Sequence, residues 1–284
     1  MHYELINQIQ LGTDAWKTQK TRIGRDGRTL MTLTSMPRFS EVLKEENIKG
    51  VNLIDHLTGR TYDKKGYRFF NDLPVPEETQ VYMNADGSIS LILDGEVIGM
   101  EYLFDGTRRQ AQDIRYLNPD GSIDWVHEFA FDGSTFSNIL YYNGDMQEIM
   151  FMDNAEQVHV RFFYYDGAIN LITVEDPKTH KVTAKYDTLG AFLGAEVAKM
   201  TTADDTITIT YLGLELDAVS QTKAHVVLDM VESPYDENGN VRGNLLAILE
   251  GRLGYVDEVL VNQADFDRLA KDGVPTDRLS VVTK

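Results

Sequence analysis

Residues 116–133 read YLNPDGSIDWVHEFAFDG, and this stretch decides the fold. Two turn-forming pairs, Asp120-Gly121 and Asp132-Gly133, enclose a segment in which every second residue is large and mostly apolar. Asp-Gly tolerates the positive φ angles of tight hairpin turns, and alternation with a period of two is typical of a strand with one buried face. The stretch therefore predicts a strand over residues 123–131 between two chain reversals.

The same pattern recurs along the middle of the chain. From Asp105 onward, the turn pairs begin at residues 105, 120, 132, 143, 154 and 166, and the segments between them are rich in β-branched and aromatic residues. This spacing leaves no room for helices, so we expect one long antiparallel β-meander from about residue 78 to residue 186. Adjacent aromatic pairs place rings on both faces of the sheet. The second face is therefore either covered as well or a recognition surface.

The two ends of the chain differ from this meander. After residue 186, apolar strands alternate with helical stripes, which predicts an incomplete Rossmann-like α/β half over residues 187–284. We expect its helix at 242–253 to end at Gly254. Residues 1–77 form a less defined α/β segment, with a strand near 29–35, a helix at 38–48 and no Gly-rich loop. The fold class is an α+β composite of three parts: 1–77, 78–186 and 187–284.

Composition limits the classes of partner. The chain has 284 residues and a net charge of -18, which disfavours binding to nucleic acid and to anionic membrane surfaces. It contains no cysteine, and no apolar run approaches the roughly 20 residues that span a bilayer. The N-terminus, MHYELINQIQLG, lacks the basic and apolar regions of a signal peptide. We therefore expect a cytoplasmic protein without an integral membrane segment.

Motifs for catalysis, cofactors and metals are not recognisable. The six histidines are scattered, and Asp265 and Asp267 of the DFD triplet lie in a predicted helix, where residues two apart do not face each other. Residues 235–250 resemble a calcium loop at three positions but lack its glycine and its bidentate glutamate. The sequence therefore predicts no catalytic residue, no bound cofactor and no metal site.

The order of segments nevertheless resembles one family. RFFNDLPVPEETQV (68–81), the sheet segments YLNPDGSIDWVHEF (116–129) and YYNGDMQEIMFMDN (141–154), and the closing stretch GYVDEVLVNQADFDRLAKDGVPTDRLSVVT (254–283) are similar to bacterial GT-B glycosyltransferases that carry an inserted β-sheet domain. FFNDLPVPE looks most like the GtfB-type, non-catalytic subunit of the accessory Sec glycosyltransferase pair. Wall teichoic acid glycosyltransferases share the inserted sheet, so the resemblance leaves the acceptor open.

What the family implies is specific. The accessory Sec pair adds N-acetylglucosamine to serine-rich repeat adhesins, so the resemblance implies a catalytic glycosyltransferase partner and a Ser/Thr-rich polypeptide acceptor. The family's N-terminal strand and Gly-rich loop are not recognisable here. Its donor-binding half also has no counterpart within the 284 residues, so no catalytic or donor-binding residue is carried over. We expect these residues to be inactive alone.

Three functions follow from these observations. In the first, the chain is a stabilising, chaperone-like subunit that binds an extended acceptor and docks on a catalytic glycosyltransferase through the sheet. In the second, it is the N-terminal half of a glycosyltransferase, with a protein or teichoic acid acceptor, that needs a separate donor-binding half. In the third, it is an interaction module unrelated to sugars. The candidate contacts for an acceptor or partner are Trp125, Phe129, Tyr141, Phe163 and Tyr165, whose alternative role is packing in the core.

Overall fold

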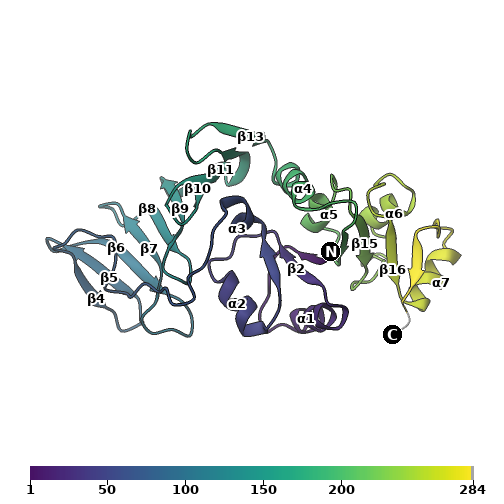
Figure 1. Cartoon of the computed structure of the whole chain (residues 1–284), viewed down its shortest axis with the longest axis horizontal. Helices are drawn as coiled ribbons and strands as arrows, with labels where there is room; N and C mark the ends of the chain where they lie inside the picture. The colour runs from purple at the N-terminus through teal and green to yellow at the C-terminus, as the bar shows by residue number, and fades with distance from the viewer. Residues whose placement is uncertain (283–284) are drawn as a thin grey trace. The chain divides into compact units, whose positions relative to one another are not determined.

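The computed structural model describes residues 1–282 of the chain. Its packing divides them into two compact units, each with its own sheet (Figure 1). The first unit contains residues 1–34, residues 47–53 and the chain from residue 190 on, and the second contains residues 35–46 and 54–189. The domain boundaries expected at residues 77/78 and 186/187 stay predictions.

The first unit is built on a seven-stranded parallel sheet in the order β17-β16-β15-β14-β1-β2-β3. Its strands are β1 (His2–Ile6), β2 (Thr29–Thr32), β3 (Gly50–Asn52), β14 (Thr206–Ile209), β15 (His225–Asp229), β16 (Glu258–Val261) and β17 (Leu279–Val281). The connecting helices are α1 (Asp14–Asp26), α4 (Leu189–Met200), α5 (Leu214–Ala218), α6 (Gly243–Leu249) and α7 (Gln263–Lys271). Fully buried residues such as Ile207 and Val226 explain why strands β14 to β17 are short apolar runs in the sequence.

The N-terminal strand that was not recognisable in the sequence is β1, which lies inside the parallel sheet between β14 and β2. The sequence of β1 does not indicate a buried strand, because the residue in the middle of HYELI is the charged Glu4, which is nevertheless 0% exposed. Its carboxylate accepts hydrogen bonds from Arg22 Nη2 at 2.7 Å and Arg28 Nη1 at 2.6 Å, which neutralise the buried charge. A charged residue at a core position breaks the apolar pattern, and its partners are 18 and 24 residues away.

Helix ends in this unit follow local chemistry. Thr13 caps α1, and its hydroxyl oxygen accepts a hydrogen bond from Trp16 N–H at 3.2 Å. Gly27, in the left-handed region at φ 63°, closes the same helix. The prediction that Gly254 ends α6 is wrong. The helix ends at Leu249, and Gly251 at φ 76° takes the left-handed position.

The second unit is built on a ten-stranded antiparallel sheet whose strands follow one another in chain order from β4 to β13. They are β4 (Gln80–Met83), β5 (Ile89–Leu93), β6 (Glu96–Leu103), β7 (Ala111–Leu117), β8 (Ile123–Phe129), β9 (Thr135–Tyr142), β10 (Asp145–Met152), β11 (Val158–Tyr165), β12 (Ala168–Glu175) and β13 (Val182–Tyr186). The predicted meander is confirmed. Helix α2 (Phe39–Glu46) belongs to this unit, and α3 (Leu53–Thr58) begins at the junction of the two units.

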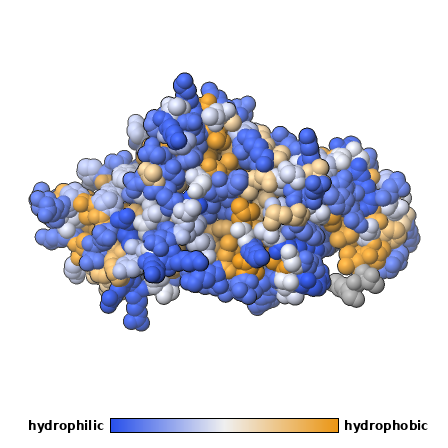
Figure 2. Space-filling model, viewed as in Figure 1, coloured by the Kyte–Doolittle hydropathy of each residue, from blue (hydrophilic) through white to orange (hydrophobic). Residues whose placement is uncertain are grey.

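The surface is mainly polar, as the charged fraction of the sequence requires. Apolar residues form separate patches on the face seen in Figure 2. Among residues 1–282, no helix is both long and apolar enough to cross a bilayer.

Candidate functional sites

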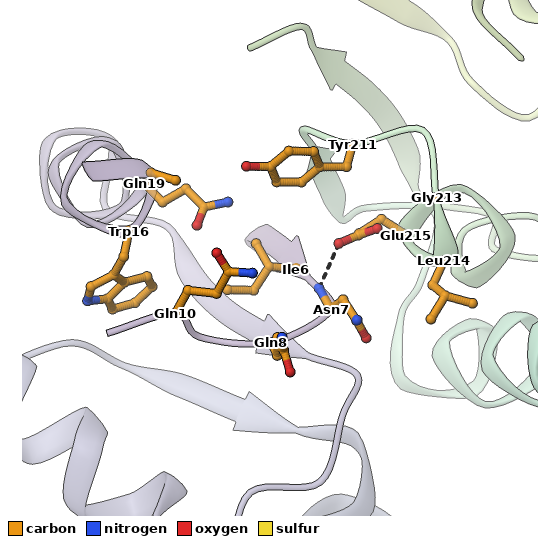
Figure 3. A pocket seen from close by; sticks show the side chains of 11 residues that line it. Ile6, Asn7, Gln8, Gln10, Trp16, Gln19, Tyr211, Gly213, Leu214 and Glu215 are labelled. Carbon is orange, nitrogen blue, oxygen red and sulfur yellow. Dashed lines mark hydrogen bonds between the residues drawn. The ribbon is translucent and has the colours of Figure 1, made fainter. Parts of the chain in front are cut away.

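The parallel sheet places one pocket at its topological switch point. Chain connections leave β1 toward β2 on one side, whereas β14, on the other side, is reached only after the whole second unit. Ligands of open α/β sheets bind at such a point, beyond the carboxyl ends of the strands. The pocket of about 320 Å³ lies there, between the segments that follow β1 and β14 (Figure 3).

The lining of this switch-point pocket is rich in amides and aromatic rings. Asn7, Gln8 and Gln10 follow β1, Gln19 and the buried Trp16 come from α1, and Tyr211 follows β14. Asn7 N–H donates a hydrogen bond to the Glu215 carboxylate at 2.8 Å, drawn as a dashed line in Figure 3. Amides both donate and accept hydrogen bonds, so the pocket suits a neutral ligand with several hydroxyl or amide groups.

In the described part of the chain, this pocket lacks the pair of acid and base that catalysis by proton transfer needs. Glu215 is its one carboxylate, and it is buried and held by Asn7 N–H. Gln19 Nε2 is likewise engaged, at 3.3 Å from Thr210 Oγ1. The arrangement can bind and orient a ligand, but it does not bring an acid and a base together. The sequence signal for the pocket is the polar run NQIQ directly after HYELI, which becomes readable once β1 is recognised.

The antiparallel sheet carries a second candidate site on one of its faces. The strand registers place Tyr116, Trp125, Leu140, Glu148 and Phe163 opposite one another on β7 to β11, in one cross-strand row. We call the face with this row face A and the opposite face, which carries Val126, Ile139, Ile149 and Phe162, face B. The row is partly exposed, and the Tyr116 and Trp125 rings stack with centroids 4.4 Å apart and an angle of 7°.

The structure separates the five sequence-predicted contacts. Trp125 and Phe163 lie in the row on face A. Phe129 is 0% exposed and packs in the core of the sheet with Ile89 and Leu91. It therefore occupies the position of a core residue, which was the alternative to a binding contact. Strand alternation places Tyr141 on face B, and Tyr165 is 75% exposed at the end of β11.

The motif FFNDLPVPE forms a cover over part of face A. Residues 66–76, the crossing segment, run over the sheet, and Phe70, Leu73 and Val75 pack against the core of β5 to β8. Tyr116 donates its hydroxyl hydrogen to Pro74 O at 3.2 Å, which joins this cover to the start of the exposed row. Face A is therefore covered over β5 to β7 and at the Phe129 end of β8, and it is partly exposed along the row from Trp125 to Phe163.

A polar row lies beside the aromatic row on face A. In register, His127 stands opposite Asn138, and Asn138 opposite Met150. Thr135 Oγ1 donates to Glu156 at 2.7 Å, so His127 Nε2, 3.0 Å away, is the donor toward Thr135. Burial lowers the pKa of His127 to about 4, so the ring is neutral at pH 7. Within residues 1–282, His127 Nδ1 and Asn138 Oδ1 are buried acceptors without a donor.

Three buried carboxyl groups were missed by sequence reasoning. Glu101 on face A is 0% exposed, neither of its oxygens has a hydrogen-bond partner within residues 1–282, and burial raises its pKa to about 8. Asp113 and Glu128 stand opposite each other on face B. Burial raises the pKa of both, while Ser137 donates to Glu128 and Arg115 to Asp113. The one sequence signal for these three groups was strand alternation, which assigns each charged residue of β6 to β8 to one face of the sheet.

Metal-binding geometry does not occur in the part of the chain that the structure describes. No group of three or more His, Asp or Glu residues there is arranged to hold an ion. In α7, Asp265 accepts from Asn262 Nδ2 at 2.6 Å and Asp267 from Gln263 Nε2 at 2.7 Å.

Comparison with known proteins gives matches among solved structures. The chain matches the Gap123 glycosylation-associated protein complex of Streptococcus agalactiae with a TM-score of 0.73 and 15% identity, over 100% of this chain and 60% of that one. It matches the pneumococcal O-GlcNAc transferase GtfA, solved with UDP and GlcNAc, with a TM-score of 0.76 and 12% identity, over 99% and 59%. It matches TarM of S. aureus with a TM-score of 0.73 and 12% identity, over 99% and 60%.

These matches concern the fold. At 12–15% identity they show that the chain shares the fold of part of these proteins, which confirms the predicted fold class and the resemblance to GT-B glycosyltransferases that carry an inserted sheet. The chain spans about 60% of the length of each of these proteins. No protein-family model and no curated protein matches the sequence.

Proposed function

We propose that this chain is a glycosyltransferase-associated subunit that binds an extended Ser/Thr-rich polypeptide on face A and docks on a catalytic glycosyltransferase. The observation that supports this most is the open row of Tyr116, Trp125, Leu140 and Phe163 in a sheet that glycosylation proteins share. Strands lie about 4.8 Å apart, so the row from β7 to β11 spans about 19 Å. That length fits about six residues of an extended polypeptide.

The chemistry of the row suits such an acceptor. Aromatic and aliphatic side chains give contact area to any extended backbone, whatever its sequence. Polar groups accompany the rings. Glu148 lies within the row, where its carboxylate pairs with Arg161 at 2.6 Å, and His127 and Asn138 lie in the neighbouring row. Hydroxyl groups of Ser and Thr both donate and accept hydrogen bonds, so they suit a surface on which charged and amide side chains lie beside the rings. A long acceptor with many hydroxyl groups is therefore favoured over a compact apolar one.

A second candidate is the acceptor-side half of a catalytic glycosyltransferase that works with a separate donor-binding half. It is supported by the switch-point pocket, whose amides and rings suit hydroxyl-bearing groups, and by the match to GtfA. Both candidates need a donor-binding half from outside these 284 residues for sugar transfer. They differ in whether the switch-point pocket contributes to turnover.

Binding of a fluorescein-labelled Ser/Thr-rich peptide, followed by anisotropy, tests the first candidate. We expect the double variant Trp125→Ala/Phe163→Ala to weaken binding by about tenfold or more, because aromatic anchors dominate such surfaces. Tyr82→Ala is the matched control, since this ring is 61% exposed on β4 of the same sheet but lies outside the row. Equal losses for both variants, or binding that neither changes, would exclude face A as the acceptor surface.

Docking on the catalytic subunit is tested separately, by analytical ultracentrifugation of a mixture of this chain and the glycosyltransferase. We expect a stable complex with a glycosyltransferase from the same cell. Loss of peptide binding with the complex intact would separate acceptor recognition from docking.

A further inference from the structure

Four cations without a partner gather at one place on this strongly acidic protein. Lys64 and Lys65 lie just before the crossing segment, and Arg108 and Arg109 lie in the loop between β6 and β7. Within residues 1–282, their side chains form no ion pair or hydrogen bond, and all four are exposed. A net charge of -18 supplies many carboxylates, so four adjacent cations that pair with none are unexpected.

Exposed apolar side chains accompany these cations. Tyr67 and Phe69 are 60% and 39% exposed, and their rings meet edge to face with centroids 4.5 Å apart. Met83, at the end of β4, is 50% exposed. Two open hollows of about 460 and 520 Å³ share Phe69, Arg108 and Arg109, so they form one groove. We call it the basic groove.

The backbone of the basic groove is fixed by the sheet. Phe70 N–H donates to Arg109 O at 2.8 Å and Ala111 N–H to Arg68 O at 2.9 Å, so the two walls are joined like neighbouring strands. Gly133, at φ 84°, lets the chain at Tyr67 and Arg68 pass close by, since a Cβ there would lie 2.6 Å from Arg68 N. Arg68 itself is engaged, with its guanidinium 4.7 Å above the Phe129 ring and Nε donating to Gly133 O.

Nearby carboxylates are already occupied. Asp132 accepts from Asp63 N–H at 2.9 Å and from the Ser134 hydroxyl at 2.7 Å. Asp63 accepts from Lys65 N–H at 2.9 Å. These bonds hold the loop in shape and leave the lysine and arginine side chains directed to solvent. The groove is thus a positively charged and partly apolar surface whose four cations form no ion pair within residues 1–282.

We propose that the basic groove binds an acidic peptide segment of a partner protein, one with aromatic or aliphatic residues between its carboxylates. Arginine pairs with carboxylates through two parallel hydrogen bonds, and the exposed rings give apolar contact between the charged positions. An open groove of this size takes a stretch of chain rather than a single ion. This site lies outside the face A row and does not depend on the acceptor proposed for it.

Charge disfavours the other large partners. A second copy of this chain, a nucleic acid and an anionic membrane each carry extended negative charge, which the remaining surface of the protein repels. A short acidic segment brings only as many charges as the groove can neutralise. Its negative charge therefore meets the four cations with little of the repelling surface nearby.

The test measures binding of fluorescein-labelled peptides built from Glu-Glu-Phe repeats to the whole chain by anisotropy. Gln-Gln-Phe repeats test for charge, and vesicles containing phosphatidylserine test for a membrane surface. The key variant is Arg108→Glu/Arg109→Glu. Its matched control, Lys178→Glu/Lys181→Glu, makes the same change in net charge at exposed positions between β12 and β13. Thermal melting of both variants verifies that they fold.

We expect the Glu-Glu-Phe peptide to bind, and the Arg108→Glu/Arg109→Glu variant to weaken binding by about tenfold or more, with the control unchanged. High salt should reduce the affinity as well, because exposed charges carry the interaction. Equal affinity for the Gln-Gln-Phe peptide, an equal loss in the control, or no peptide binding would overturn the proposal. Vesicle binding that depends on Arg108 and Arg109, without peptide binding, would replace it with a membrane site.

Discussion

Replacement of Glu101 by Gln should stabilise the protein at neutral pH. Burial in the core of the antiparallel sheet raises the pKa of this carboxyl from an ordinary 4.5 to about 8. At pH 7 the unfolded chain therefore ionises at Glu101, whereas the folded protein must keep the proton. A difference of one pKa unit corresponds to about 1.36 kcal/mol, so the 2.5 units between 4.5 and 7 cost up to about 3 kcal/mol.

The sign of this effect fixes its pH window. Below pH 4.5 the carboxyl is protonated in both states and folding incurs no penalty. As the pH rises toward 8, the unfolded state gains stability by releasing the proton and the folded state does not. Wild-type stability should thus fall between pH 4.5 and 8 more steeply than that of Glu101→Gln, which has no proton to release there.

Urea denaturation from pH 5 to pH 8 measures this difference. The matched control is Glu96→Gln, which removes an exposed carboxyl from the same strand, β6. We expect the advantage of Glu101→Gln over the wild type to grow with pH and to exceed that of the control at every pH above 5. An advantage that stays constant with pH, or that Glu96→Gln shares, would refute the assignment of Glu101 as a protonated core residue.

Three further predictions concern single residues. Trp125→Ala should weaken acceptor-peptide binding by about tenfold with a modest loss of stability, as anisotropy and thermal melting together report, because the ring is partly exposed. A large drop in melting temperature with unchanged binding would make it a core residue, for which a cost of about 3–5 kcal/mol is usual. Glu4→Gln should destabilise the protein by about 3 kcal/mol in urea, because Arg22 and Arg28 lose a shared, buried counter-charge; a loss well under that would mean that their other partners, Asp229 and Asp26, are sufficient counter-charges. Gly133→Ala should cost about 2 kcal/mol or more in the same assay, since its Cβ would collide with the backbone at Arg68; a neutral result would show that the crossing segment can shift.

The antiparallel sheet could be predicted from the sequence because its determinants are local. Each Asp-Gly or Asn-Gly pair fixes one reversal, and Gly121, Gly133 and Gly144 adopt the positive φ angles that these turns require. The strand expected over residues 123–131 is β8, which runs from Ile123 to Phe129. A strand bounded by two strong turns has little freedom in its ends, so the sequence defines it well.

The inner strand β1 of the parallel sheet could not be predicted, since its determinants are distant. Glu4 is compatible with a core strand only because Arg22 and Arg28 reach it from α1 and from the segment before β2. The switch-point pocket depends on the same strand, so it was missed together with β1. The end of α6 was misplaced at Gly254 for a related reason. Two glycines, Gly251 and Gly254, follow the helical pattern, and the choice between them depends on how α6 packs.

The candidate site on the sheet was predicted only in part. Alternation indicated that Trp125 lies on one face of its strand, but it could not place Phe163 on the same face or separate a covered part of a face from an open one. Whether an aromatic ring is exposed depends on the crossing segment, which buries Phe129 and leaves Leu140 36% exposed. Adjacent aromatic residues such as Tyr164 and Tyr165 also share no face, so composition alone could not select between them.

The most direct test of the proposed function is an assay of sugar transfer with three samples. They are this chain alone, the glycosyltransferase that co-purifies with it from its own cell, and the two together, each with a Ser/Thr-rich polypeptide and a panel of nucleotide sugars. The account predicts that the peptide is glycosylated efficiently only when both proteins are present, and that Trp125→Ala/Phe163→Ala reduces this transfer. Transfer at the same rate without the chain, or no glycosyltransferase in the purified complex, would contradict it.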